Sequence, residues 1–208
     1  ENLKNKILQT QLQIKDQELR FLKTQINPHF LFNSLNTIYG FALKKKDEAP
    51  EMILKLSNLL DYILYQIEKP QVLLMDEINH LLDYVSLEKM RFHDTLTVET
   101  NIKVANHTIQ IAPMLLIPFV ENAFKHGDII NGSLNVITDI KTEDDILFFK
   151  LENSSLKEDS KNKGIGLENI TKRLEMQYPN SYTLETNQTA NTFKVELTIR
   201  NFKYLKNE

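Results

Sequence analysis

Hydrophobic positions at the start of the chain repeat with the period of a coiled coil. Between residues 8 and 26 they alternate at spacings of four and three, which is typical of a helix that packs against a partner helix. An ordinary amphipathic helix within one domain is the alternative. The positions of this seam, interrupted once by Lys15, are Leu8, Leu12, Leu19, Leu22 and Ile26.

Two further helical patterns follow before the period changes. The segment KKKDEAP is expected to be the turn of a helical hairpin, and Lys69-Pro70 to end its second helix. That second helix is predicted from residue 48 to 67, with one side formed by Ile53, Leu56, Leu60, Leu64 and Ile67. A third helix is predicted from Met75 to Phe92, carrying Ile78, Leu81, Leu82, Val85 and Leu87.

Beyond Phe92 the hydrophobic period falls from about 3.6 to 2, which indicates strands. Strands are predicted at 96–104, 133–140, 146–151 and 193–199, and helices at about 112–126 and 166–177. The predicted fold class is therefore α+β: a helical hairpin followed by a domain with a mostly antiparallel sheet and helices on one face.

Composition removes several classes of protein. The 208 residues carry a net charge of −3, which gives no support to a nucleic-acid partner. The absence of cysteine excludes disulfides and thiolate zinc sites. The longest apolar run, residues 111–120, contains two prolines and is too short to span a membrane. Since no signal peptide is recognisable and the chain opens on Glu1, we expect a cytoplasmic piece of a longer protein.

The stretch PMLLIPFVENAFKHG (113–127) concentrates polar chemistry on one helix face. At about 100° per residue, the four polar side chains lie within about 140° of one another, and apolar residues fill the rest. They are Glu121, Asn122, Lys125 and His126. An amide or carboxylate oxygen suits magnesium, and the two basic groups suit phosphate. A solvated polar face is the open alternative.

The stretch GIGLENITKRLEMQYP (164–179) places two glycines at the start of a helix whose apolar stripe begins at Leu167. Glycines there expose backbone N–H groups to phosphate. The sequence is neither a P-loop nor GxGxxG. Taken alone, the pair favours an ordinary loop-to-helix junction.

With QINPHFLFNSLN (25–36), these stretches resemble, in order and spacing, the histidine, asparagine and glycine boxes of sensor histidine kinases. The form NPHFLFN is similar to the LytS-like branch. The resemblance covers the chain from about Gln25 to its end. It implies a coiled-coil signalling helix (1–23) and a dimerisation and phosphoacceptor hairpin (24–72) that forms a dimeric four-helix bundle. It also implies an ATP-binding catalytic domain (73–208, led by a helix at 73–92), an α/β sandwich of the Hsp90 and gyrase type.

The resemblance also assigns site residues and partners. His29 matches the phosphoacceptor, Asn122 the magnesium ligand, and Lys125 and His126 the residues that contact phosphate. The glycine box beside the nucleotide is matched by Gly164 and Gly166, with Leu167 directly after. The implied cofactors are ATP and Mg²⁺. The implied partners are a second copy of the chain, an upstream sensor or membrane segment, and a response regulator that receives the phosphoryl group on an aspartate. The chain would be the cytoplasmic portion of an inner-membrane-anchored bacterial protein.

The sequence departs from this family in one motif. Where an Asp-x-Gly-x-Gly aspartate binds the adenine amino group, this chain has LENSSL, with Glu152 or Asn153 in its place and no glycine. Adenine contact is expected through either side chain. A degenerate, non-catalytic signalling dimer is the alternative, and a stand-alone ATPase is a third reading that the NPHFLFN hairpin argues against.

The histidine box raises two further expectations. Pro28 removes one backbone N–H and clashes with the carbonyl of Thr24, so the helix is predicted to bend or loosen there. The hypothesis is that rotation or tilt of the incoming coiled coil at this bend changes the exposure of His29. A kink with a packed or capping histidine is the alternative. Since Phe30 stands where many histidine kinases have an acidic base, Glu121 is the candidate proton acceptor. Asn33, one turn on, is the candidate to position water for dephosphorylation of a partner.

Overall fold

The computed structural model describes residues 5–6, 28–66, 68–156, 165–200 and 203–204. The chain divides into two compact units, Glu1–Pro70 and Gln71–Glu208, each described here by itself. None of the helices in the described ranges is both long enough and apolar enough to cross a membrane.

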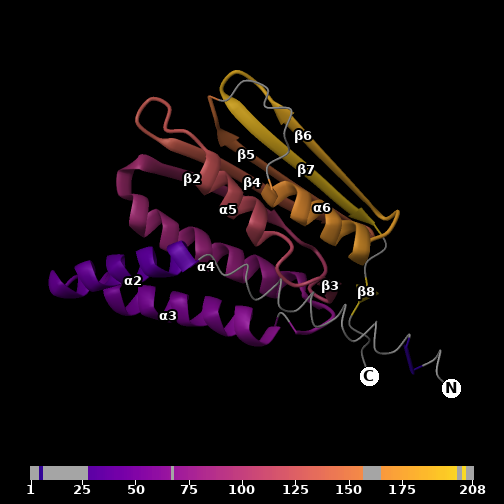
Figure 1. Cartoon of the computed structure of the whole chain (residues 1–208), viewed down its shortest axis with the longest axis horizontal. Coiled ribbons are helices and arrows are strands. Elements are labelled where there is room, and N and C mark those ends of the chain that lie inside the picture. The colour runs from indigo at the N-terminus through magenta and orange to yellow at the C-terminus, as the bar shows by residue number, and fades with distance from the viewer. Residues whose placement is uncertain (1–4, 7–27, 67, 157–164, 201–202, 205–208) are drawn as a thin grey trace. The chain divides into compact units, whose positions relative to one another are not determined.

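The first unit contains a helical hairpin (Figure 1). Helix α2 spans Pro28–Leu43, helix α3 spans Glu48–Asp61, and a π-helical turn covers Tyr62–Gln66. The turn between α2 and α3 closes with the Lys46 N–H donating to the Phe41 carbonyl over 3.0 Å, while Lys45 adopts a positive φ of 51°. The predicted coiled-coil seam at residues 8–26 lies outside the described residues.

The predicted apolar side of the second helix is only partly buried within this single chain. The buried positions of α3 are Ala49, Met52, Leu56 and Leu59. Ile53 and Leu64, which were predicted on the same side as Leu56, are 55% and 46% exposed. The physical reason is that this helix carries two adjacent apolar stripes, and spacing alone does not tell which of them is covered.

The second unit is built on a five-stranded sheet with strand order β2-β4-β5-β7-β6. Strands β2 and β4 pair in parallel, and the other three pairings are antiparallel. The strands are β2 (Leu96–Lys103), β4 (Leu134–Glu143), β5 (Ile146–Ser154), β6 (Tyr182–Gln188) and β7 (Thr192–Arg200). A small antiparallel sheet joins β1 (Val72–Leu73), β3 (Ile109–Ile111) and β8 (Lys203–Tyr204).

Three helices of this unit lie on one face of the large sheet (Figure 1): α4 (Leu74–Phe92), α5 (Ile117–His126) and α6 (Ile165–Gln177). Side chains along β4 alternate between buried and exposed, as a sheet covered on one face requires. On the covered face, the rings of Phe119 from α5 and Phe149 from β5 pack with centroids 5.3 Å apart. The predicted α+β architecture is confirmed.

The structure corrects one predicted helix boundary and adds one strand to the large sheet. The helix expected from residue 112 begins at Ile117, because the preceding residues follow a turn in which Met114 has a positive φ of 54°. Strand β6 was not predicted, because its side chains are mostly exposed or half-buried and its apolar alternation is weak. Of the apolar residues that the third predicted helix carries, Leu82 is exposed in α4.

Candidate active site

Helix α5 separates its apolar and polar side chains as the sequence predicts. Its buried residues are Ile117, Phe119, Val120, Ala123 and Phe124. Glu121 and Asn122 are half-buried, while Lys125 and His126 are exposed in the last turn. A carboxylate, an amide and two basic groups therefore share the side of the helix that does not pack on the sheet.

The asparagine motif and the glycine motif meet in space. A Cβ atom placed on Gly166, at the start of α6, would lie 2.7 Å from Asn122 Oδ1 and 2.9 Å from Asn122 Nδ2. Only glycine allows this approach, so the first turn of α6 lies directly against the amide of α5. Leu167 follows in the same turn and is half-buried, whereas Gly164 lies outside the described residues.

The structure separates the two candidates for the missing adenine-binding aspartate. Asn153 lies at the end of β5, is 3% exposed, and donates from Nδ2 to the Ser154 carbonyl over 3.0 Å. Its Oδ1 atom is buried and has no hydrogen-bond partner in the described part of the chain. Glu152 pairs with Ile137, which is exposed, so its side chain lies on the opposite, uncovered face of the sheet.

Asn153 also lies at the end of α5. A Cβ atom on Gly127, directly after that helix, would lie 3.2 Å from Asn153 Nδ2 and 2.5 Å from the Ala123 carbonyl. The buried amide oxygen of Asn153 and the Asn122–Gly166 contact therefore border the same helix. The sequence brings them together because α5 packs along β4 and β5 with its C-terminus at the end of β5.

Ser154 and Ser155 stand where the family has its glycine motif. Ser154 connects the end of β5 to the loop after α5 by hydrogen bonds. The Asp128 N–H donates to the Ser154 carbonyl over 2.9 Å, and Ser154 Oγ donates to the Asp128 carbonyl over 2.6 Å. The Leu156 N–H donates to Asp128 Oδ2 over 2.8 Å. The loop after α5 is thus held against the strand that carries Asn153.

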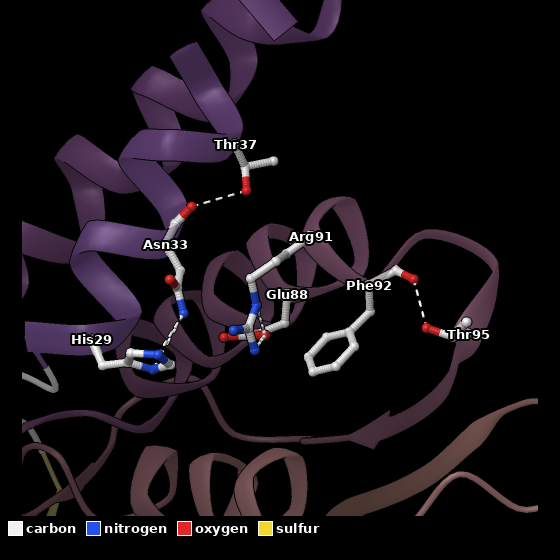
Figure 2. Close-up of polar contacts among 7 residues, drawn as sticks. All are labelled: His29, Asn33, Thr37, Glu88, Arg91, Phe92 and Thr95. Atoms are coloured by element: carbon white, nitrogen blue, oxygen red, sulfur yellow. Dashed lines mark hydrogen bonds and ion pairs between the residues drawn. The ribbon is translucent and has the colours of Figure 1, made fainter. Parts of the chain in front are cut away.

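A group near Glu121 was missed by the sequence analysis. Glu88 of α4 is 2% exposed and accepts hydrogen bonds from Nε of Arg91, at 2.8 Å, and from its Nη2 (Figure 2). Burial raises the pKa of Glu88, Arg91 lowers it, and the charge of Glu121 raises it further. Glu121 is therefore close to this ion pair. The only sequence signal was the Glu–Arg spacing of three on the third predicted helix.

In the hairpin unit, His29 and Asn33 lie one turn apart on α2. The amide nitrogen of Asn33 is 3.2 Å from both ring nitrogens of His29, whose side chain is exposed (Figure 2). The amide N–H can donate only to the ring nitrogen that carries no hydrogen, so it suits either neutral tautomer. Helix α2 begins at Pro28, and Thr24 lies outside the described residues, so the bend at Pro28 stays a prediction.

A family model described as Histidine kinase matches residues 17–96. The chain is 36% identical over 137 residues to the sensor protein LytS of Bacillus subtilis (strain 168), covering 64% of this chain and 23% of LytS. It is 32% identical over 170 residues to the sensor histidine kinase BtsS of Escherichia coli (strain K12), covering 79% of this chain and 30% of BtsS. It is 32% identical over 114 residues to the sensor histidine kinase/phosphatase LytS of Staphylococcus aureus (strain MRSA252), covering 55% of this chain and 20% of that protein.

Among solved structures, the histidine kinase domain of the Erythrobacter litoralis EL346 blue-light activated histidine kinase matches with a TM-score of 0.51. The match covers 90% of this chain and 95% of that chain at 14% identity, and it shows a shared fold. The chain belongs to the sensor histidine kinases. Within that class it is a relative of LytS and BtsS, and it spans less than a third of the length of either.

The buried Glu88 predicts a pH dependence of stability. Its pKa in the folded chain is raised above the ordinary 4.5, so the folded state holds the proton more tightly than the unfolded state. Its contribution to stability is therefore complete below pH 4.5 and is lost as the pH rises through the folded-state pKa.

Glu88→Gln cannot lose this proton. We expect the difference in free energy of unfolding, wild type minus variant, to decrease as the pH rises from 4.5 to neutral. Urea denaturation of both proteins across this range measures the difference. Parallel stability curves would show that burial does not control the ionisation of Glu88.

Proposed function

We propose that this chain is the kinase core of a two-component sensor, in which ATP bound to the second unit phosphorylates His29. The observation that carries the proposal is the buried Oδ1 atom of Asn153, which has no hydrogen-bond partner among the described residues and lies beside the Asn122–Gly166 contact. A histidine on an exposed helix face and a nucleotide site in a separate unit are the two parts that such a transfer needs.

The polar atoms around α5 fit a magnesium-bound adenine nucleotide. A buried acceptor without a partner costs about 1–3 kcal/mol, and the amino group of adenine would satisfy it. Guanine has a carbonyl oxygen at that position and would face Asn153 Oδ1 with a second acceptor. The Asn122 oxygen suits magnesium, and the first turn of α6 with Lys125 and His126 suits phosphate.

When bound, magnesium-ATP supplies the phosphoryl group and the charge neutralisation that its transfer needs. The lone pair on the unprotonated ring nitrogen of His29 is the nucleophile that attacks the γ-phosphorus and displaces ADP. The Asn33 amide N–H, which contacts the ring through that nitrogen, has to release it before the attack. Glu121 is the proposed acceptor of the proton that the imidazole loses after attack. This role requires the second unit to bring Glu121 against the hairpin.

We further propose that the core works as a homodimer. Helix α2 carries a stripe of exposed apolar side chains at helical spacing, Phe32, Leu35, Tyr39 and Leu43. A contiguous exposed apolar surface of this kind is typical of a protein–protein interface. In a homodimer, the α2 stripes of the two copies would pack against each other. The predicted coiled-coil seam at residues 8–26 would continue the contact. The partners in signalling would be a response regulator aspartate and an upstream sensor portion anchored in the inner membrane.

A second activity has one supporting observation. Asn33 lies on the same face as His29, with Thr37 Oγ1 donating to its carbonyl over 2.9 Å. An amide at that point can hold water in line with a phosphorylated partner, and the Staphylococcus aureus relative is named a kinase/phosphatase. The non-catalytic alternative is less favoured. It was motivated by the loss of the adenine-binding aspartate, and Asn153 still offers an oxygen that can accept a hydrogen bond from adenine.

The transfer to His29 can be tested directly. Incubation with radiolabelled ATP and magnesium should label the protein in an acid-labile form, as expected of phosphohistidine. His29→Gln should remove the label while leaving the circular dichroism spectrum unchanged, since this side chain is exposed. Label that persists in His29→Gln would assign the phosphoacceptor elsewhere, and release of phosphate with no labelled protein would favour an ATPase.

The adenine contact can be tested with two neighbouring residues. Asn153→Leu removes the buried acceptor, so we expect roughly a tenfold or greater increase in the Kd of a non-hydrolysable ATP analogue. Glu152→Gln, on the other face of β5, should leave the Kd unchanged. Isothermal titration calorimetry measures both. The reverse pattern would show that Glu152 binds the base.

The dimer can be tested on the stripe of α2. Phe32 and Tyr39 are 66% and 65% exposed, so Phe32→Glu with Tyr39→Glu should fold yet repel the same surface of a second copy. Sedimentation equilibrium should show a dimer constant weakened by roughly tenfold or more. The control is Leu156→Glu, an exposed apolar residue of the second unit. An unchanged constant in the double variant would place the interface elsewhere.

A further inference from the structure

The segment that leads into α5 is buried but has no regular structure of its own. Residues 112–116 are all buried, and Met114 takes a positive φ of 54°. Backbone N–H and carbonyl groups in such a segment lack the partners that a helix or strand would give them. Charged side chains from two other helices supply those partners.

Glu77 of α4 supplies the acceptors. It is 0% exposed, and its two carboxylate oxygens accept one backbone N–H each: Met114 at 2.9 Å and Leu116 at 2.8 Å. A buried carboxylate is tolerated when charge-assisted hydrogen bonds replace its hydration. The two bonds fix the position of the residues directly before Ile117, where α5 begins.

Arg173 of α6 supplies the donors. It is 6% exposed, and its two terminal nitrogens donate to the carbonyls of Met114 and Pro113. Met114 is thus held by α4 through its N–H and by α6 through its carbonyl. Directly after α6, Tyr178 Oη accepts the Ala112 N–H over 2.8 Å. Burial raises the pKa of Tyr178 to about 12, and the charges of both Arg173 and Glu77 act on it, so these groups share one buried region.

The same two helices meet again at the candidate nucleotide site. Gly166 lies seven residues before Arg173, which is about 10 Å along a helix. Asn122, which Gly166 contacts, lies on α5 six residues after the Leu116 N–H that Glu77 accepts. Helices α5 and α6 are therefore connected at two places. Arg173 of α6 binds the buried segment before α5, and Gly166 at the start of α6 contacts Asn122 of α5.

We propose that Glu77 and Arg173 are positioning residues for the nucleotide site, setting the spacing between Asn122 and the first turn of α6. This inference rests on the proposed function. We call the hydrogen bonds of Glu77 and Arg173 to residues 113–116 the clamp. Without the clamp, α5 and α6 can shift apart at these residues, and a single nucleotide no longer reaches the Asn122 amide and the α6 backbone together. Neither residue touches the ligand, so their effect passes through the helices.

The test separates positioning from stability. Glu77→Gln replaces one acceptor oxygen by a donor that faces a backbone N–H, and Arg173→Met removes both donors. Tyr178→Phe is the matched control, because it leaves the Ala112 N–H buried without its acceptor but does not touch residues 113–116. The measurements are the thermal midpoint and the Kd for a non-hydrolysable ATP analogue by calorimetry, at a temperature where all variants are folded.

We expect all three variants to lose thermal stability. Glu77→Gln and Arg173→Met should raise the Kd roughly tenfold or more, while Tyr178→Phe should change it less than about twofold. Arg173→Lys, which keeps a charged donor, should recover part of the loss. If either main variant fails to fold, Glu77→Asp and Arg173→Lys should still raise the Kd by roughly threefold against the same control.

Three outcomes would overturn the inference. An unchanged Kd in the Glu77 and Arg173 variants, with binding intact in the wild type, would remove the positioning role and leave the proposed function standing. A Kd that rises in step with lost stability in all variants, Tyr178→Phe included, would reduce the clamp to a purely structural element. Absence of nucleotide binding in the wild type would overturn the proposed function together with this inference.

Discussion

The packing of the apolar face of α5 against the sheet is the interaction on which the rest of the second unit depends. Its larger buried side chains, Ile117, Phe119, Val120 and Phe124, each contribute about 1.5–3 kcal/mol of hydrophobic stabilisation when fully removed from water. Because that face is fixed on β4 and β5, the opposite face can only point away from the sheet. The direction of Glu121, Asn122, Lys125 and His126 is therefore a consequence of core packing, decided before any ligand is present.

This packing has a cost at the start of the helix. The chain must enter α5 through the buried segment 112–116, and a buried carboxylate and a buried guanidinium satisfy its backbone. Replacing buried ion pairs by apolar residues is often neutral or stabilising in other proteins, so such groups are weak evidence for stability. Glu77 and Arg173 also fix the conformation of this segment, because their hydrogen bonds are directional. Glu77 joins α4 to the segment, and Arg173 joins α6 to it.

Local pattern and tertiary contact explain what the sequence could and could not reveal. The polar face of α5 was predictable because helical periodicity alone determines it. The start of α5 was not, because residues 112–116 continue the apolar run and the positive φ of Met114 leaves no mark in that pattern. The stripe of α3 that is buried within this chain was not predictable either, because two apolar stripes satisfy the same spacing rule. Glu77 escaped notice because an acidic residue beside Asp76, in the first turn of a helix, is typical of a solvated, dipole-stabilising position.

The family resemblance assigned Asn122 and Gly166 to the same nucleotide, but their direct contact appears only in the structure, since nothing local connects residues so far apart. Asn153 shows where tertiary structure adds to that resemblance. The Ser154 carbonyl accepts the Asn153 amide and the Asp128 N–H, so an aspartate at 153 would set a carboxylate oxygen against a carbonyl oxygen. The local structure of this chain therefore suits an amide. Its nitrogen is committed to Ser154, and its oxygen is left facing the covered side of the sheet, where only a hydrogen-bond donor can satisfy it.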